Sequence, residues 1–274
     1  MPITPTDFEK YLISEYFKHG SINKVFYFHH FGIPISYAGY DRVLTKYGII
    51  KSAGPNSKLT ESLGVLSMVA DYKLSLEKIY EKYAPQTIRV STNTLHRILH
   101  YTRLGLTRRQ GVALIISPKT SKKLYLIGRD ISLSQPGLGQ KGDLSLPMGH
   151  ARTGENPRDS IIRVLQQEVF TDLTLSKEFP YEVVPEHPKP VMYMKIADIR
   201  VSVFQISLVG DYSFSSVKLD NIEFQTLNQI RQKSIRPGVE DILKVYENSL
   251  EIEDESVPEY NCSLNLALAE VENQ

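Results

Sequence analysis

The sequence predicts an α+β protein in which an all-helical first part is followed by a mixed-sheet part. Through residue 109, apolar side chains recur at helical spacing between short breaks of Gly, Pro and Ser. Beyond Arg109, the apolar residues gather in short runs or alternate with polar ones, as in strands. The expected parts are a first helical unit (1–58), a second helical unit (59–109), a sheet region (110–250) and a C-terminal tail (251–274).

Composition narrows the class of protein. The 274 residues include one cysteine, Cys262, which cannot form an internal disulfide, and the first ten residues lack the apolar run of a signal peptide. Apolar runs also stop short of the roughly 18 residues that a membrane-spanning helix needs. We therefore expect a cytoplasmic protein with no membrane partner. We expect the tail to be partly disordered, with a short terminal helix or strand that packs on a neighbour as the alternative.

Charge is divided unevenly along the chain. Residues 1–109 carry 15 Lys and Arg against 8 Asp and Glu, a surplus of +7, whereas the remainder carries 17 against 23, a balance of −6. A basic segment of this kind favours a polyanionic partner, although solvated helical surfaces carry similar charge.

The first helical unit is expected to hold three helices, at 7–18, from Ser21 to about 31, and from Ser36 to 47. Gly32 and Pro34 break the chain before the third helix, so the segment resembles a helix-turn-helix unit, whose third helix enters the DNA major groove. The alternative is a three-helix bundle used for packing or dimerisation. The side chains expected to contact DNA are Tyr37, Tyr40, Arg42 and Lys46.

The second helical unit repeats the pattern, with helices predicted at 60–72, at 75–83 and from a capping Ser91 or Thr92 onward. Two such units in a basic segment favour double-stranded DNA, bound by a homodimer or by one chain that spans a site alone. His96 and His100 are four residues apart, but without a nearby Cys or acidic cluster we expect phosphate contact rather than a metal. The DNA-contacting side chains expected here are Asn93, His96, Arg97, His100 and Arg103.

The sheet region is predicted from its strand patterns. We expect a hairpin of strands 111–117 and 122–129, then a loop at 134–142. Two further strands, at 191–196 and 199–208, suit pairing, and a helix from Pro237 to about 247 ends the region.

Residues 146–170, here called the box segment, carry the most chemical information. Gly149 is followed after five residues by Glu155 and after seven more by Arg163, with Leu165 and Glu168 next. This spacing resembles the Nudix box, and the preceding Leu-Pro, the Gly before Glu155 and the closing helix also resemble that family. The resemblance covers roughly half the chain and implies an α/β/α fold.

The departures from the Nudix pattern concern its metal ligands. Family members commonly hydrolyse a pyrophosphate linked to another moiety, using Mg²⁺ held by carboxylates on one turn of the box helix. Here Val164 and Gln167 stand at two of the three acidic positions, and Phe170 replaces the later glycine. Glu168 and Glu155 remain as the expected metal ligands, and such a pair holds Mg²⁺ weakly.

Three functions follow from this resemblance. A helix-turn-helix segment joined to a weakened Nudix domain is similar to Nudix-related transcription regulators that sense a nucleotide-type metabolite, which predicts a DNA-binding regulator without efficient hydrolysis. The alternatives are a Mg²⁺-dependent hydrolase of a nucleoside diphosphate derivative and a non-catalytic RNA-binding or scaffold protein. The expected ligand-binding residues are Gly149, His150, Glu155, Arg163, Gln167 and Glu168.

Overall fold

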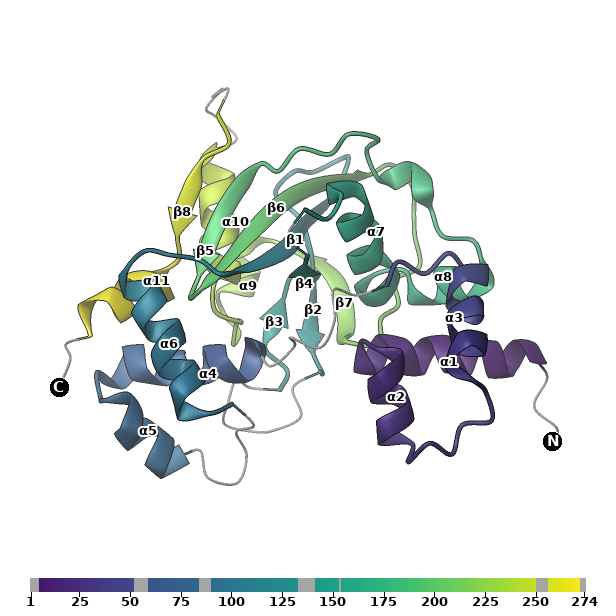
Figure 1. Cartoon of the computed structure of the whole chain (residues 1–274). Helices are drawn as coiled ribbons and strands as arrows, with labels where there is room; N and C mark the ends of the chain where they lie inside the picture. Colours follow the sequence, from purple (N-terminus) through teal and green to yellow (C-terminus); the bar gives the residue numbers. More distant parts are fainter. Residues whose placement is uncertain are drawn as a thin grey trace.

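A computed structural model describes residues 5–51, 59–83, 90–132, 141–152, 154–249 and 256–271, and it confirms the α+β class (Figure 1). The helices are α1 (Pro5–His19), α2 (Ile22–Phe28), α3 (Tyr37–Lys46), α4 (Leu59–Tyr72), α5 (Leu76–Tyr83), α6 (Thr92–Arg103), α7 (Pro157–Glu168), α8 (Thr171–Ser176), α9 (Leu227–Ile230), α10 (Val239–Ser249) and α11 (Ser263–Glu270). The strands are β1 (Arg109–Pro118), β2 (Tyr125–Asp130), β3 (Leu144–Ser145), β4 (Met148–Ala151), β5 (Met192–Ile196), β6 (Ile199–Leu208), β7 (Leu219–Gln225) and β8 (Glu259–Asn261). Among these helices none has the length and apolar character needed to traverse a bilayer.

Two sheets form the centre of the molecule. The larger has the order β4-β1-β6-β5-β8, and the smaller has the order β3-β2-β7. β1 and β6 are parallel over ten residue pairs, whereas β1 pairs with β4, and β5 with β6, in antiparallel fashion. Alternate side chains of β1 enter two cores, Leu114 and Ile116 packing with α7 and Ala113 and Ile115 packing with β2.

The structure corrects one strand pairing. Strands 111–117 and 122–129 were expected to form a hairpin, but β1 lies between β4 and β6, while β2 lies between β3 and β7. β1 is buried along nearly its whole length, as a central strand is, and a continuous apolar run does not specify its neighbours. The pairing of β5 with β6 is confirmed, and residues 134–140 of the expected loop lie outside the described residues.

The first helical unit forms its own core from α1, α2 and α3. The predicted caps are confirmed, because the Ser21 and Ser36 hydroxyls accept from the Lys24 and Gly39 amides at 3.2 and 3.1 Å. Residues 29–36, which join α2 to α3, exceed the three- or four-residue turn of a helix-turn-helix unit.

Tyr40 was predicted to contact DNA, and this prediction is wrong. Its side chain is fully buried and its hydroxyl donates to the Leu12 carbonyl oxygen. Tyr40 lies three and four residues before Val43 and Leu44, so the three residues share the inner face of α3.

The second helical unit packs on the end of the chain. α11 lies against α4 and α6, and β8 extends the larger sheet beside β5 (Figure 1). Leu264 and Leu268, four residues apart, are buried in a core that α4, α6 and the sheets share. The tail was expected to be partly disordered, but residues 256–271 are ordered by this packing. Figure 1 places the first and second helical units at opposite ends of the molecule.

Candidate functional site

The box segment folds into strand β4, a loop and helix α7, which Asn156 caps through the Arg158 amide at 2.9 Å. β4 and α7 approach closely at Gly149, where an added Cβ would lie 3.1 Å from Cγ2 of Val164. Val164 is itself 1% exposed. The valine that replaces an acidic residue therefore packs the interface between strand and helix and offers no metal ligand.

Arg163 ties the box loop to α7. Its Nη2 lies 3.0 Å from Oε2 of Glu155 and also donates to the His150 carbonyl oxygen. The Arg152 amide donates to the same Glu155 oxygen at 3.0 Å. Because the Arg163 side chain is only 3% exposed and that of Glu155 only 11%, the pair holds the loop.

Lys218 belongs to the site, although no sequence motif predicted it. Its Nζ lies 3.1 Å from Oε1 of Glu168 and 3.2 Å from Oε1 of Gln167. The other Glu168 oxygen accepts from the Met148 amide at 2.8 Å. An ammonium group thus lies between the two α7 side chains at which the Nudix pattern has metal-binding carboxylates.

A second buried ion pair lies close to the first. Asp130 on β2 is joined to Arg236 at 2.9 Å, and the Asp130 side chain is 3% exposed. Burial raises the pKa of Glu168, and the charge of Asp130 adds to this, while Lys218 acts in the opposite direction. We call the following residues the charge cluster: Asp130, His150, Gln167, Glu168, Lys218 and Arg236.

His150 is, like Gln167, an uncharged member of the charge cluster. Burial is the main cause that lowers its pKa to about 4, and the charges of Arg109, Lys218, Arg236 and Arg163 contribute. The imidazole is therefore neutral at physiological pH and can give or accept a hydrogen bond. Because it is neutral, the imidazole does not repel these four cations.

The charge cluster does not fit Mg²⁺. Mg²⁺ requires near-octahedral oxygen ligands, commonly with one or two free carboxylates. Glu168 already binds Lys218, Asp130 binds Arg236, and the other expected ligand, Glu155, binds Arg163. A divalent cation would have to displace a lysine or arginine from its carboxylate and would meet the remaining positive charges.

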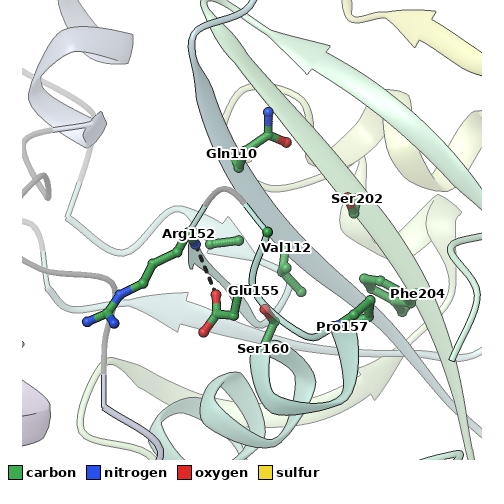
Figure 2. Close-up of a pocket in the computed structure, with 10 residues that line it drawn as sticks. Gln110, Val112, Arg152, Glu155, Pro157, Ser160, Ser202 and Phe204 are labelled. Atoms are coloured by element: carbon green, nitrogen blue, oxygen red, sulfur yellow. Dashed lines mark hydrogen bonds between the residues drawn. The ribbon is translucent and has the colours of Figure 1, made fainter. Parts of the chain in front are cut away.

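A half-open cavity of about 160 Å³ lies beside the box loop (Figure 2). Gln110 and Val112 of β1 and Ser202 and Phe204 of β6 form its floor, and Glu155 closes it from the loop side. Ligand pockets usually have about 300–1,000 Å³, so this cavity suits a single ring or sugar. Its full lining is Gln110, Val112, Ala151, Arg152, Gly154, Glu155, Pro157, Ser160, Ser202 and Phe204.

The predicted ligand residues thus divide into three groups. His150, Gln167 and Glu168 belong to the charge cluster, Glu155 lines the cavity, and Gly149 and Arg163 shape the interface between β4 and α7. Lys218 lies outside the box segment and follows no motif, and Arg236 begins the segment RPGVEDIL, which resembles the closing Nudix helix but does not indicate the partner of Arg236. The one signal for them in the sequence is the retained acid Glu168, because a buried carboxylate needs a partner.

Gln166 connects the site helix to the first helical unit. It is fully buried, its Nε2 donates to the Gly48 carbonyl at 2.9 Å, and its Oε1 accepts from the Ile50 amide at 3.1 Å. Val217, the neighbour of Lys218, packs against the core of the first helical unit. The two residues that directly precede Gln167 and Lys218 in the chain therefore both contact that unit.

The predicted DNA contacts are mostly on the surface. Lys46 pairs with Glu9 at 2.7 Å, His96 pairs with Glu77, and Arg103 donates to the Val271 carbonyl at 2.6 Å. Arg103 is half-buried by that contact, which limits its reach toward DNA. The exposed side chains are Tyr37, Arg42, Lys46, Asn93, His96, Arg97 and His100.

Comparison with known proteins gives a limited result. No protein-family model matches the chain, and no curated protein does. A MutT protein of Methanosarcina mazei Go1 aligns at 15% identity over 54% of this chain and 98% of its own, with a TM-score of 0.37. A Nudix hydrolase of Nitrosomonas europaea aligns at 15% identity over 57% and 80%, with a TM-score of 0.40.

An ADP-ribose pyrophosphatase of Streptococcus suis 89-1591 aligns at 11% identity over 56% of this chain and 99% of its own, with a TM-score of 0.39. With TM-scores under 0.5, these alignments say nothing about what the site does.

Proposed function

We propose that the sheet region is a Nudix-like domain that binds a nucleotide-type anion without hydrolysing it, and that the helical units bind DNA in response. The observation that carries the first part is the ammonium of Lys218 between Glu168 and Gln167. It supplies a fixed positive charge at the place where a metal would otherwise stabilise phosphate oxygens.

Lys218 remains able to contact a ligand. An ammonium has three N–H donors, and two of them account for the bonds to Glu168 and Gln167. The side chain is 26% exposed, so the third donor can reach a phosphate oxygen. Arg236, with its side chain 16% exposed, adds a second cation nearby.

Hydrolysis is disfavoured by the same arrangement. Metal-assisted attack on a pyrophosphate needs an ion that both activates water and neutralises developing charge. A lysine neutralises charge but does not generate hydroxide from bound water. We therefore assign the site to binding, with no catalytic residue.

The contacts of Gln166 and Val217 support a link between ligand and DNA. Both touch the first helical unit from positions next to charge-cluster residues. A ligand that draws Lys218 away from Glu168 would disturb the contacts of Gln166 and Val217 with the first helical unit. The ligand changes DNA binding only if its affinity differs between the arrangement of the helical unit that binds DNA and an arrangement that does not.

Exposed cations and hydrogen-bonding groups support the DNA-binding part. Asn93, Arg97 and His100 project from α6 to solvent, and Arg42 does so from α3. Residues 1–109 also carry the +7 surplus of charge. Because α6 presents more such groups than α3 does, α6 is the stronger candidate for groove contact.

The test is a titration of the full chain with duplex DNA from its own genomic neighbourhood, at several salt concentrations, with and without ADP-ribose. We expect sequence-selective binding whose affinity changes when the nucleotide is added. Absence of duplex binding at low salt, where phosphate contacts are strongest, would overturn the DNA-binding part. A preference for single-stranded RNA would instead favour the RNA-binding alternative.

Arg97→Ala is expected to weaken DNA binding and to reduce the slope of log K against log salt by about 1, because one phosphate contact is lost. The matched control is Lys122→Ala, which removes one exposed cation from the sheet region. An unchanged slope in Arg97→Ala, or an equal change in the control, would contradict a DNA contact by α6.

A further inference from the structure

We propose that Glu15, His19 and His29 form a zinc-binding site in the first helical unit. One ligand atom from each residue lies within 4.8 Å of the others. Two imidazoles and a carboxylate, with a fourth position left open, form a known zinc-binding set. The site lies outside the charge cluster and is independent of the proposed function.

The carboxylate of Glu15 is already aimed at both imidazoles. Its Oε2 lies 2.6 Å from Nε2 of His29 and 3.6 Å from Nε2 of His19. Zinc–ligand bonds of about 2.0–2.2 Å place the ligand atoms of a tetrahedral site roughly 3.4 Å apart. Shifts of about an ångström would therefore admit the ion.

The fold brings the three ligands together from two helices. Glu15 and His19 are four residues apart on α1 and so share one face, and His29 is the C-cap of α2. The next two residues, His30 and Phe31, have φ values of 50° and 59°, which turn the chain away immediately after His29. A bound ion would tie the end of α1 to the end of α2.

The surroundings suit a closed, partly dry site. Glu15 is 5% exposed, and its other oxygen, Oε1, accepts from Nζ of Lys18 at 2.7 Å, which leaves Oε2 for the metal. The ring of Phe28 lies 4.4 Å from that of His19. Burial lowers the pKa of His19, which favours the neutral imidazole that zinc requires.

The fourth ligand would be water or Tyr11. The Tyr11 hydroxyl lies 3.4 Å from Nε2 of His29, one of the three ligand atoms. Zinc binding at Nε2 of His29 requires the imidazole proton to lie on Nδ1, so the hydrogen bond between His29 and Glu15 would be replaced by a bond from each residue to the metal. The competing arrangement is a plain hydrogen bond from His29 to Glu15, with no affinity for metal.

The experiment measures metal in the full-length chain, purified without a metal-affinity tag. We expect about one zinc per chain by mass spectrometry and a melting temperature that falls by several degrees after chelation and recovers with ZnCl₂. Replacement by Co²⁺ should give the intense visible absorption of a tetrahedral cobalt site. No bound zinc, no cobalt spectrum and no zinc-dependent shift would overturn the proposal.

His29→Gln and His19→Gln should each abolish the cobalt spectrum and the zinc-dependent shift. The matched control is His30→Asn, which alters the adjacent exposed histidine and tolerates its positive φ. Circular dichroism of each apo variant shows whether it folds. If folded His19→Gln and His29→Gln bind zinc as tightly as His30→Asn does, the assignment of ligands is wrong.

Discussion

Arg163→Ala should lower the free energy of unfolding by about 3 kcal/mol or more, because it leaves a carboxylate without its partner in a nearly closed site. The guanidinium holds Glu155 and the His150 carbonyl, and the Arg163 side chain is 3% exposed. Removing it frees the box loop from α7 and leaves space against Gly149. Urea unfolding of the full chain, followed by circular dichroism, measures the effect.

The control for Arg163→Ala is Arg231→Ala on the surface. Arg231 pairs with Glu240 at 2.9 Å, but both side chains are more than a third exposed, and such a pair contributes about 1 kcal/mol or less. Glu155→Ala combined with Arg163→Ala should cost less than the sum of the two single changes. A loss under about 1 kcal/mol for Arg163→Ala would show that the pair does not hold the loop.

Lys218→Met is expected to weaken binding of ADP-ribose at least about tenfold, because a charge-assisted hydrogen bond contributes roughly 1.5–3 kcal/mol. Lys218→Arg keeps the charge and should lose much less. Lys233→Met, which alters an exposed lysine next to Glu223, is the matched control and should bind as the wild type does. Equal affinity in Lys218→Met and the control would remove Lys218 from the ligand site.

The same Lys218→Met change should destabilise the fold in a pH-dependent way. Lys218 is the largest influence that lowers the pKa of Glu168, so its loss raises that pKa further above the model-peptide value of 4.5. A carboxyl group whose folded pKa is raised destabilises the protein at higher pH, and the cost disappears below the unfolded pKa. The difference in unfolding free energy between variant and wild type should therefore shrink from about pH 7 to about pH 4.

Much of the local structure could be predicted from the sequence. The serine caps of α2 and α3 and the strands β5 and β6 follow from patterns of a few neighbouring residues, and the resemblance of the box segment to the Nudix box implied the helix α7. The resemblance of the box segment to the Nudix box also implied that Glu155 and Arg163 tie the loop to the helix, and the two side chains are paired. Such features depend on residues close together in the chain, which sequence patterns describe well.

The errors and omissions depend on contacts between distant residues. Nothing in the sequence near Lys218 shows that it meets Glu168, fifty positions earlier. Tyr40 was expected on the outer face of the third helix of a helix-turn-helix unit, whereas its ring fills the core and its hydroxyl donates to a backbone carbonyl. The sequence does not show where the tail packs, because its partners, α4 and α6, precede it by more than 150 residues.

The most direct test of the account is calorimetric titration of the full chain with ADP-ribose, first in EDTA and then in Mg²⁺, with nucleotide monophosphate measured afterwards. If Lys218 supplies the positive charge, affinity in EDTA should equal that in Mg²⁺ within about twofold, and no monophosphate should be released. Binding that requires Mg²⁺, or release of monophosphate that Glu168→Gln abolishes, would contradict the account and identify the protein as a hydrolase.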